Sequence, residues 1–197
     1  GKLRTKYKKK LSKYDGFLIT PLGVEIFKSA IEKTGKRFEG INIFPSTYDY
    51  AKAYHASDKI FYGSFNADKL RASKKYKEML SILAQEDIIS FYGPKYAWGG
   101  FERNWGGMLP KEELLEKINQ HGVALVLHSE SHFKSNIPTG RIFEAASANA
   151  VIISDRNKFV EDNFGDSILY IDVDKSSVEM AEQISKHYKW IKEHPVE

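Results

Sequence analysis

Short apolar runs alternate with longer amphipathic stretches along most of this chain, and this alternation constrains its fold more than any other feature. The run VALVLH at 123–128 is apolar up to its final histidine, as expected for a parallel strand covered on both faces. The stretches between such runs carry apolar residues at helical spacing. The pattern predicts an α/β fold, with a Rossmann-like, mainly parallel sheet flanked by helices.

The boundaries of the expected elements follow from this pattern. Strands are predicted at 15–20, 41–45, 59–63, 87–93, 123–128, 150–154 and 167–172. Helices are predicted at 23–35, 69–85, 110–122, 139–149, 157–164 and 176–194, and 46–57 is expected to be a linker. Gly35 and Gly122 are suited to end their helices, because glycine tolerates the left-handed conformation. The last helix is expected to bury Val178, Ala181, Ile184, Tyr188 and Ile191.

The composition narrows the classes of function. The chain has no cysteine, which excludes disulfides, cysteine metal ligands and cysteine nucleophiles and fits a reducing compartment. It has no run of about eighteen apolar residues for a membrane-spanning helix, and no apolar signal-peptide core follows the basic start. We therefore expect a cytoplasmic protein.

Positive charge is concentrated at the beginning of the chain. The formal net charge is +4, and the first residues include Lys2, Arg4, Lys6, Lys8, Lys9, Lys10 and Lys13. Two interpretations stay open: peripheral contact with a membrane surface, or a solvated terminus. The second is favoured, and no nucleic-acid partner is expected, because no set of interleaved aromatic residues offers a stacking platform.

The carboxyl ends of the predicted strands are the expected ligand edge of the sheet. They carry Gly63-Ser64, Gly93-Pro94, His128-Ser129, Ser154-Asp155 and Asp172. Glycine after a strand lets the backbone approach a ligand closely, although two tight turns explain Gly63 and Gly93 equally well. A dinucleotide-binding G-x-G-x-x-G after the first strand, a Walker A motif and a G-x-S-x-G elbow are all absent from the sequence.

The segment HSESH at 128–132 allows two interpretations. In an extended conformation, His128, Glu130 and His132 lie on one side and resemble a metal site. The segment leaves a strand for a loop, however, so the favoured interpretation is a polar loop at the ligand edge. His128 is then a donor to a ligand oxygen, and no metal or other cofactor is expected.

The stretch TGRIFEAAS, which begins at Thr139, is the strongest candidate for a binding site. The turn around Gly140 leads into a helix whose free N–H groups face the ligand edge and can bind an anion. Arg141 adds a bidentate phosphate contact, and Glu144, on the same helix face, can accept hydrogen bonds from a vicinal diol such as a ribose. The alternative is a surface Arg–Glu pair, which contributes little.

The order of these segments resembles the C-terminal half of a GT-B glycosyltransferase of family 4, the "glycosyl transferases group 1" type, including its CgeB-like branch. The resemblance covers about 58–194 and is carried by KIFYGSF, IISFYGP, NWGGMLPKEELLEKINQHGVALVLHS, IPTGRIFEAASANAVIISD and FGDSILYID. It implies that 1–57 close the N-terminal GT-B domain and form the interdomain linker. It also implies that 58–197 form the nucleotide-sugar-binding domain with its final long helix.

The resemblance also implies site residues and partners. Glu144 corresponds to the family's ribose-binding glutamate, Gly140 and Arg141 to the turn at the diphosphate, Gly63 and Ser64 to the loop beside the phosphates. Met108 and Leu109 correspond to the loop against the base, and Gly93, Ser129 and Thr139 are expected nearby. The donor is a UDP- or GDP-linked sugar and the acceptor a glycan, lipid or protein. Asn136 stands where the family has a second glutamate, and Asn149 where it has a glycine.

Three functions are compatible with these residues. The first is the donor-binding part of a glycosyltransferase, with Arg141, Glu144 and His128 as its catalytic residues. The second is a nucleotide-sugar epimerase or phosphorylase on the same fold, with His128 as the acid–base group. The third is a non-catalytic module that binds a nucleotide sugar.

Overall fold

The computed structural model describes residues 13–19, 21–41, 52–55, 58–64 and 70–194. The first part is a small β–α–β unit: strands β1 (Gly16–Ile19) and β2 (Arg37–Gly40) pair in parallel and are joined by helix α2 (Pro21–Glu32). The sequence pattern predicts the second of these strands at 41–45, whereas β2 ends at Gly40 and 42–45 lie outside the described residues.

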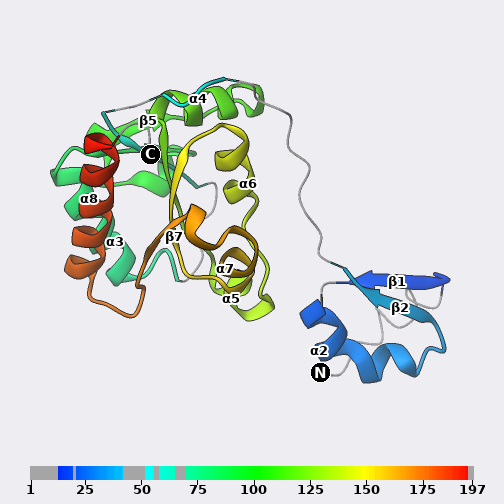
Figure 1. The fold of residues 1–197 in the computed structure, drawn as a ribbon. Helices are drawn as coiled ribbons and strands as arrows, with labels where there is room; N and C mark the ends of the chain where they lie inside the picture. The colour runs from blue at the N-terminus through cyan, green and yellow to red at the C-terminus, as the bar shows by residue number, and fades with distance from the viewer. Residues whose placement is uncertain (1–12, 20, 42–51, 56–57, 65–69, 195–197) are drawn as a thin grey trace.

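The remaining strands form one parallel six-stranded sheet (Figure 1). They are β3 (Ile60–Gly63), β4 (Ile89–Tyr92), β5 (Trp105–Gly107), β6 (Val123–Val126), β7 (Val151–Asp155) and β8 (Leu169–Ile171). Their order is β5-β4-β3-β6-β7-β8. The chain thus builds one half of the sheet outward from β3 and the other outward from β6, so the strand order reverses between β3 and β6. In doubly wound sheets, ligands bind outside the carboxyl ends of the strands at this reversal.

Helices cover both faces of the sheet (Figure 1). Helices α3 (Lys74–Gln85) and α8 (Ser177–Glu193) pack on one face, where Met79, Phe91 and Met180 belong to one buried cluster. Helices α4 (Leu114–His121), α6 (Gly140–Ser147) and α7 (Lys158–Phe164) pack on the other, around Phe61 and Ile142. Short elements complete the chain: α5 (Glu130–Ser135), η1 (Lys95–Trp98), η2 (Glu102–Asn104), η3 (Lys111–Glu113) and η4 (Gly165–Ser167).

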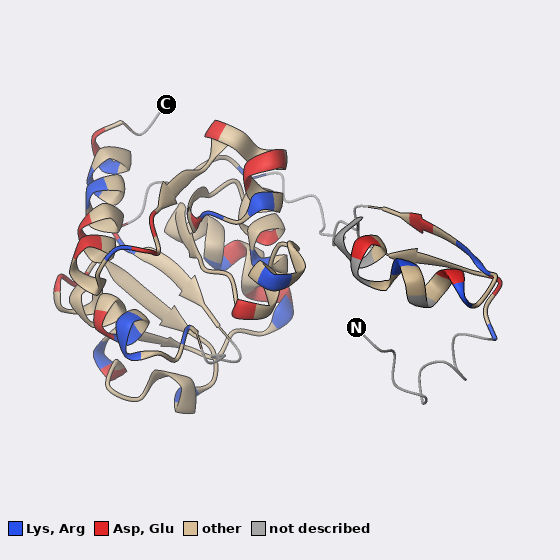
Figure 2. Cartoon of the chain, turned by 90° about the horizontal axis from the view of Figure 1, so that it is seen from below, with Lys and Arg blue, Asp and Glu red and all other residues tan. Residues whose placement is uncertain are grey.

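Charged residues lie almost entirely outside this sheet, as Figure 2 shows for the blue and red positions on the surrounding helices. Among the six strands, the sequence places a single charged residue, Asp155, which is fully buried at the end of β7. A buried charge is costly unless it is paired, so this carboxylate requires a specific partner.

The predicted α/β class with a mainly parallel sheet is confirmed. Gly122 ends α4 in the left-handed conformation with φ +64°, as expected, whereas α2 already ends at Glu32 and Gly35, with φ +66°, lies in the turn that follows. Val178 is 52% exposed, so its expected place on the buried side of the last helix is wrong. Strand β5 and helix α5 were not expected from the sequence pattern. None of the helices in the described ranges has the length and hydropathy needed to cross a membrane.

Candidate functional site

A pocket of about 340 Å³ opens at the carboxyl ends of β3 and β6, where the strand order reverses. Three segments of the predicted site contribute to it: the end of β3, the end of β6 and the start of α6. The lining residues are Tyr62, Gly63, Ser64, Arg71, Leu125, Leu127, Thr139, Gly140, Arg141 and Glu144. The pocket therefore brings together six residues that the sequence singled out: Gly63, Ser64, Thr139, Gly140, Arg141 and Glu144.

The first turn of α6 forms one wall of this pocket. Pro138 favours an extended conformation for the residue before it, and Thr139 occupies the N-cap position with φ −75° and ψ 145°. The Thr139 side chain makes no capping hydrogen bond to the helix. Among the described residues, the Thr139 side chain thus caps none of the N–H groups of the first turn, which lie at the positive end of the helix dipole.

Arg141 lies in the same turn, and its side chain is only 12% exposed. Its guanidinium lies 5.8 Å from the centre of the Phe61 ring, and Nη1 lies 2.7 Å from Oε2 of Glu144. That contact is an ion pair without hydrogen-bond alignment: Nε and Nη1 are buried and find no hydrogen-bond acceptor among the described residues. Burial lowers the pKa of Arg141, and the Glu144 charge opposes that shift. A buried guanidinium with unfilled donors favours an anionic ligand.

Arg71 is a second cation at this pocket, and the sequence analysis did not select it. It lies in the segment between β3 and α3, and its Nη1 donates to Oγ of Ser64 at 3.5 Å. The available signal was a basic residue between a glycine-ended strand and the helix that follows it at the ligand edge. Arg71 escapes the sequence analysis because helical periodicity predicts one helix over 69–85, which includes Arg71, whereas α3 begins at Lys74.

Gly63 and Gly93 differ in their roles. A Cβ on Gly63 would lie 2.9 Å from the Phe61 ring and 3.6 Å from Nη2 of Arg141, so this glycine lets the backbone pass close to the cation. Gly93 does not line the pocket. Its φ is +130°, and a Cβ there would lie 2.2 Å from the carbonyl oxygen of Ser64. Gly93 therefore lets the backbone at the end of β4 pass close to the carbonyl group of Ser64.

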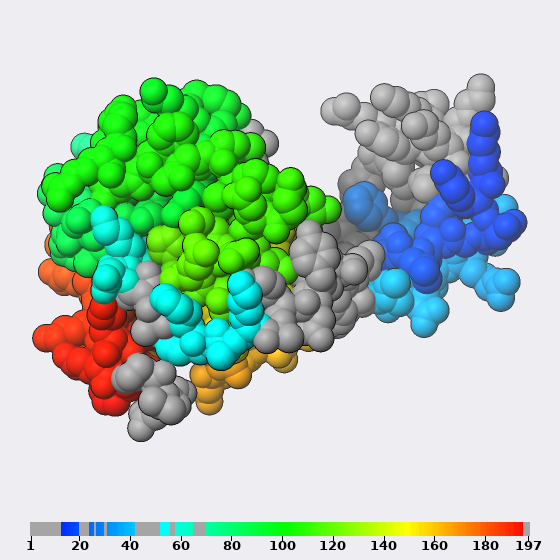
Figure 3. Space-filling view, turned by 90° about the horizontal axis from the view of Figure 1, so that it is seen from above, coloured from blue at the N-terminus to red at the C-terminus, as the bar shows by residue number. Residues whose placement is uncertain are grey.

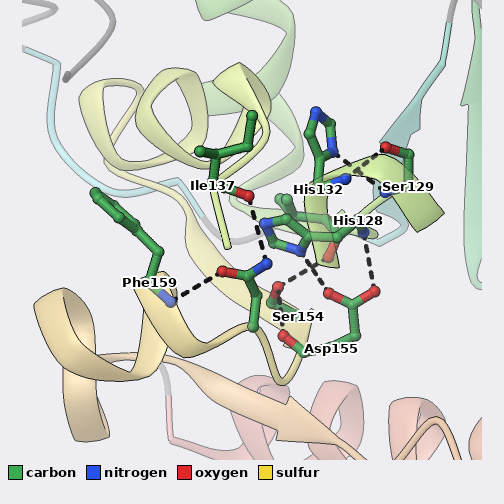
Figure 4. Close-up of polar contacts among 9 residues, drawn as sticks. His128, Ser129, His132, Ile137, Ser154, Asp155 and Phe159 are labelled. Carbon is green, nitrogen blue, oxygen red and sulfur yellow. Dashed lines mark hydrogen bonds and ion pairs between the residues drawn. The ribbon is translucent and has the colours of Figure 1, made fainter. Parts of the chain in front are cut away.

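His128 and Asp155 form a buried pair beside the pocket (Figure 4). Oδ2 of Asp155 accepts the backbone N–H of His128 at 2.9 Å, and Oδ1 lies 2.5 Å from Nδ1 of the ring. These contacts tie the carboxyl end of β6 to that of β7 and provide the partner that buried Asp155 requires. Nε2 of His128 is buried too, without a hydrogen-bond partner among the described residues. The imidazole does not line the pocket, in contrast to the placement expected from the sequence.

The remaining candidates lie away from the pocket. Ser129 is the N-cap of α5, where its Oγ accepts the backbone N–H of His132 at 3.2 Å. Because α5 begins at Glu130, the residues of HSESH do not share one side as they would in an extended segment: Glu130 pairs with Lys134 instead. Met108 is 55% exposed, and Leu109 packs against the buried cluster around Phe61.

A comparison with models of protein families identifies the family of the domain that carries this pocket. Residues 69–194 match the family described as "Glycosyl transferase-like". The chain belongs to this glycosyl transferase-like family. The matched range includes Arg71, Arg141 and Glu144 of the pocket, and a search of curated proteins finds no significant match.

Solved structures show a fold similar to that of this glycosyl transferase-like chain. It resembles the crystal structure of TarM with a TM-score of 0.58 and 14% identity, over 93% of this chain and 39% of the other. It resembles that of the GtfA/B complex with a TM-score of 0.54 and 12% identity, over 95% and 40%. The chain thus spans about two fifths of the length of each. The resemblance to glycosyltransferases inferred from the sequence is confirmed, while the CgeB-like branch stays a prediction.

Proposed function

We propose that this chain is the donor-binding half of a glycosyltransferase that uses a nucleotide-diphosphate sugar. The observation that carries the proposal is the buried Arg141 guanidinium, whose Nε and Nη1 lack hydrogen-bond acceptors among the described residues at the start of α6. A diphosphate supplies oxygen acceptors at that place and charge for the cation. Membership of the glycosyl transferase-like family supports this donor class.

The proposed reaction moves the sugar from the donor to an acceptor hydroxyl and leaves a nucleoside diphosphate. Arg141, Arg71 and the backbone N–H groups at the start of α6 stabilise the negative charge that develops on the leaving diphosphate. These donors are held in place before the reaction, so little reorganisation is needed. Gly63 and Ser64 bring the backbone after β3 close to the phosphates.

Glu144 is the proposed ribose contact. Its side chain is 32% exposed at the pocket, and its ion pair with Arg141 keeps it in reach of the same ligand. An ionised carboxylate can accept both hydroxyl hydrogens of a vicinal diol. The buried pair of His128 and Asp155 favours a positioning role for His128, in which it fixes the loop after β6 without touching the donor.

The proposal extends to the rest of the protein. Residues 1–57 close the acceptor-binding domain and lead through the linker to a donor domain at 58–197. The donor carries UDP or GDP and the acceptor is a glycan or a lipid. The proposed location is cytoplasmic, with peripheral contact to a membrane through the basic residues at 2–10, which lie outside the described residues.

Calorimetric titration of this chain with UDP and GDP tests the donor site. We expect one of them to bind, and Glu144→Ala to weaken that binding about tenfold, the loss typical of a charged hydrogen bond. The loss is expected to be smaller for the 2′-deoxy and 3′-deoxy nucleotides, which lack one hydroxyl of the diol. Glu182→Ala, which removes an exposed carboxylate on α8, is the matched control. If neither nucleotide binds, or if Glu144→Ala binds as the wild type does, the proposal fails.

A further inference from the structure

A second pocket, of about 670 Å³, lies at the opposite end of the sheet from Arg141. It is formed at the amino ends of β7 and β8, by the segment around Tyr54, the loop before β7, the η4 turn and the end of α8. Figure 3 shows the cyan, orange and red parts of the chain on one face of the molecule. A strand of five residues spans about 16 Å, so this pocket is separate from the donor site by at least the length of the strands.

Aromatic side chains give this pocket its apolar surface. Trp190 is 41% exposed and stacks on His194 with ring centres 4.8 Å apart and an interplanar angle of 20°. Tyr54 lines the pocket from the segment at 52–55. Helix α8 packs into the core through Met180 and Ile184, and Trp190 lies off that buried face. The tryptophan therefore offers a large rigid surface for a ligand.

The segment that carries Tyr54 is fixed to the domain. Nδ2 of Asn119 donates to the carbonyl oxygens of Ala53 and Ala148, each at 2.9 Å. Gly122 packs against the backbone of His55 so closely that a Cβ would lie 1.5 Å from its carbonyl oxygen. The Tyr54 side of the pocket is thus held by the C-terminal end of α4, so the pocket is formed before a ligand binds.

The polar groups of the pocket select the class of ligand. Asn149, Asp166 and Ser167 line it beside the aromatic rings. Among its described lining residues there is no Lys or Arg, and Asp166 adds a carboxylate, so a phosphate-bearing ligand is disfavoured. Sugar rings fit both kinds of surface. Their C–H faces are apolar and pack on aromatic side chains, and their hydroxyl groups form hydrogen bonds with amide, carboxylate and hydroxyl groups.

We propose that this pocket binds a glycan, as an accessory site for a saccharide acceptor at a distance from the donor site. The inference rests on the proposed glycosyltransferase function, because it takes the glycan to be part of the acceptor. A second attachment point raises the local concentration of an acceptor chain near the site of transfer without any new contact at the reacting sugar.

Titration with maltohexaose, cellohexaose and chitohexaose, monitored by amide chemical shifts, tests the site. We expect at least one of them to bind and to change the amide chemical shifts of residues that line this pocket. Trp190→Ala is expected to weaken that binding at least tenfold. Asp166→Ala, a second change at an exposed position, is expected to weaken it as well. Val178→Ala, near the other end of the same helix, is the control and is expected to bind as the wild type does.

Binding of UDP and GDP, measured in the same samples, separates this proposal from the donor site. Trp190→Ala is expected to leave nucleotide binding unchanged, and Glu144→Ala to leave glycan binding unchanged. The accessory site is refuted if none of the three saccharides binds, or if Trp190→Ala and Asp166→Ala both bind them like the wild type. If the wild type binds a saccharide but neither UDP nor GDP, only the donor site is refuted.

Discussion

Nη1 of Arg141 lies 2.7 Å from Oε2 of Glu144, three residues along the first turn of α6, and both side chains line the pocket at the strand-order reversal. A surface pair at this spacing contributes a few tenths of a kcal/mol at most. Here the guanidinium is largely buried, and burial is the main cause that lowers its pKa. Arginine nevertheless stays charged at neutral pH, so the pocket keeps a guanidinium whose Nε and Nη1 have no hydrogen-bond acceptor among the described residues.

Replacement of Arg141 by methionine tests the role of this cation. The change removes the charge and retains a side chain that can pack near Phe61. Affinity for UDP or GDP is expected to fall about 10- to 100-fold, since a charged hydrogen bond contributes about 1.5–3 kcal/mol. Thermal stability is expected to hold, because the remaining partner, Glu144, is 32% exposed and can be solvated when the guanidinium is removed. Calorimetry checks the affinity, with the exposed Arg103→Met as control, and an unchanged affinity would contradict the assignment.

Replacement of Gly140 by alanine separates ligand binding from folding. A Cβ at Gly140 meets nothing within 4 Å, so the fold accepts it, and alanine favours a helix by up to about 1 kcal/mol over glycine. The added methyl group takes up space at a pocket-lining position where the ligand approaches the backbone N–H groups. We expect an unchanged or higher melting temperature together with weaker nucleotide binding. Nucleotide affinity equal to that of the wild type would show that no ligand approaches this turn.

Replacement of Gly93 by alanine is expected to destabilise the domain by roughly 2–3 kcal/mol, because it combines strain at φ +130° with a contact of 2.2 Å to the Ser64 carbonyl. Gly99→Ala is the matched control: a Cβ there meets nothing within 4 Å, and its φ is −56°. Urea unfolding measures both changes. Equal stabilities of the two variants would mean that the backbone at Ser64 moves aside for the new side chain at little cost.

The sequence predicts the larger part of this fold because apolar periodicity reports burial, and burial defines both faces of a doubly wound sheet. It predicts β6 and the start of α6 well, since an unbroken apolar run and a turn around Gly140 leave few alternatives. Strand β5 escapes prediction because Trp105–Gly107 contains two glycines and is too short to show a period. Helix α5 escapes because its six residues are mostly polar.

The candidate site is predictable where chemistry and chain position coincide, as at Arg141 and Glu144. It is not predictable where tertiary packing decides. Nothing local in the sequence indicates that the imidazole of His128 is held by Asp155, which lies one strand away. Arg71 joins the pocket through the path of the chain between β3 and α3, and sequence periodicity carries no information about that path.

His121 predicts a pH dependence of stability. Its Nδ1 lies 2.8 Å from the carbonyl oxygen of Lys59, which can only accept, so Nδ1 carries the hydrogen. Nε2 of the neutral ring then accepts from the hydroxyl of Tyr92 at 2.9 Å, and burial raises the pKa of that hydroxyl, which keeps it a donor. Burial is also the main cause that lowers the pKa of His121.

The sign of the effect follows from which state binds the proton. The unfolded chain protonates His121 near its ordinary pKa of about 6.5, whereas the folded chain resists protonation to a lower pH. The stabilising contribution is therefore complete above about pH 6.5 and is lost as the pH falls through the lower, folded-state pKa. Below pH 6.5, the wild type is expected to lose unfolding free energy more steeply than His121→Gln, by at most about 1.4 kcal/mol per pH unit. Urea unfolding at pH 7, 6 and 5 measures this difference, and a ring titration by NMR assigns it to His121. Parallel pH profiles for the two proteins would show that His121 titrates normally in the folded chain.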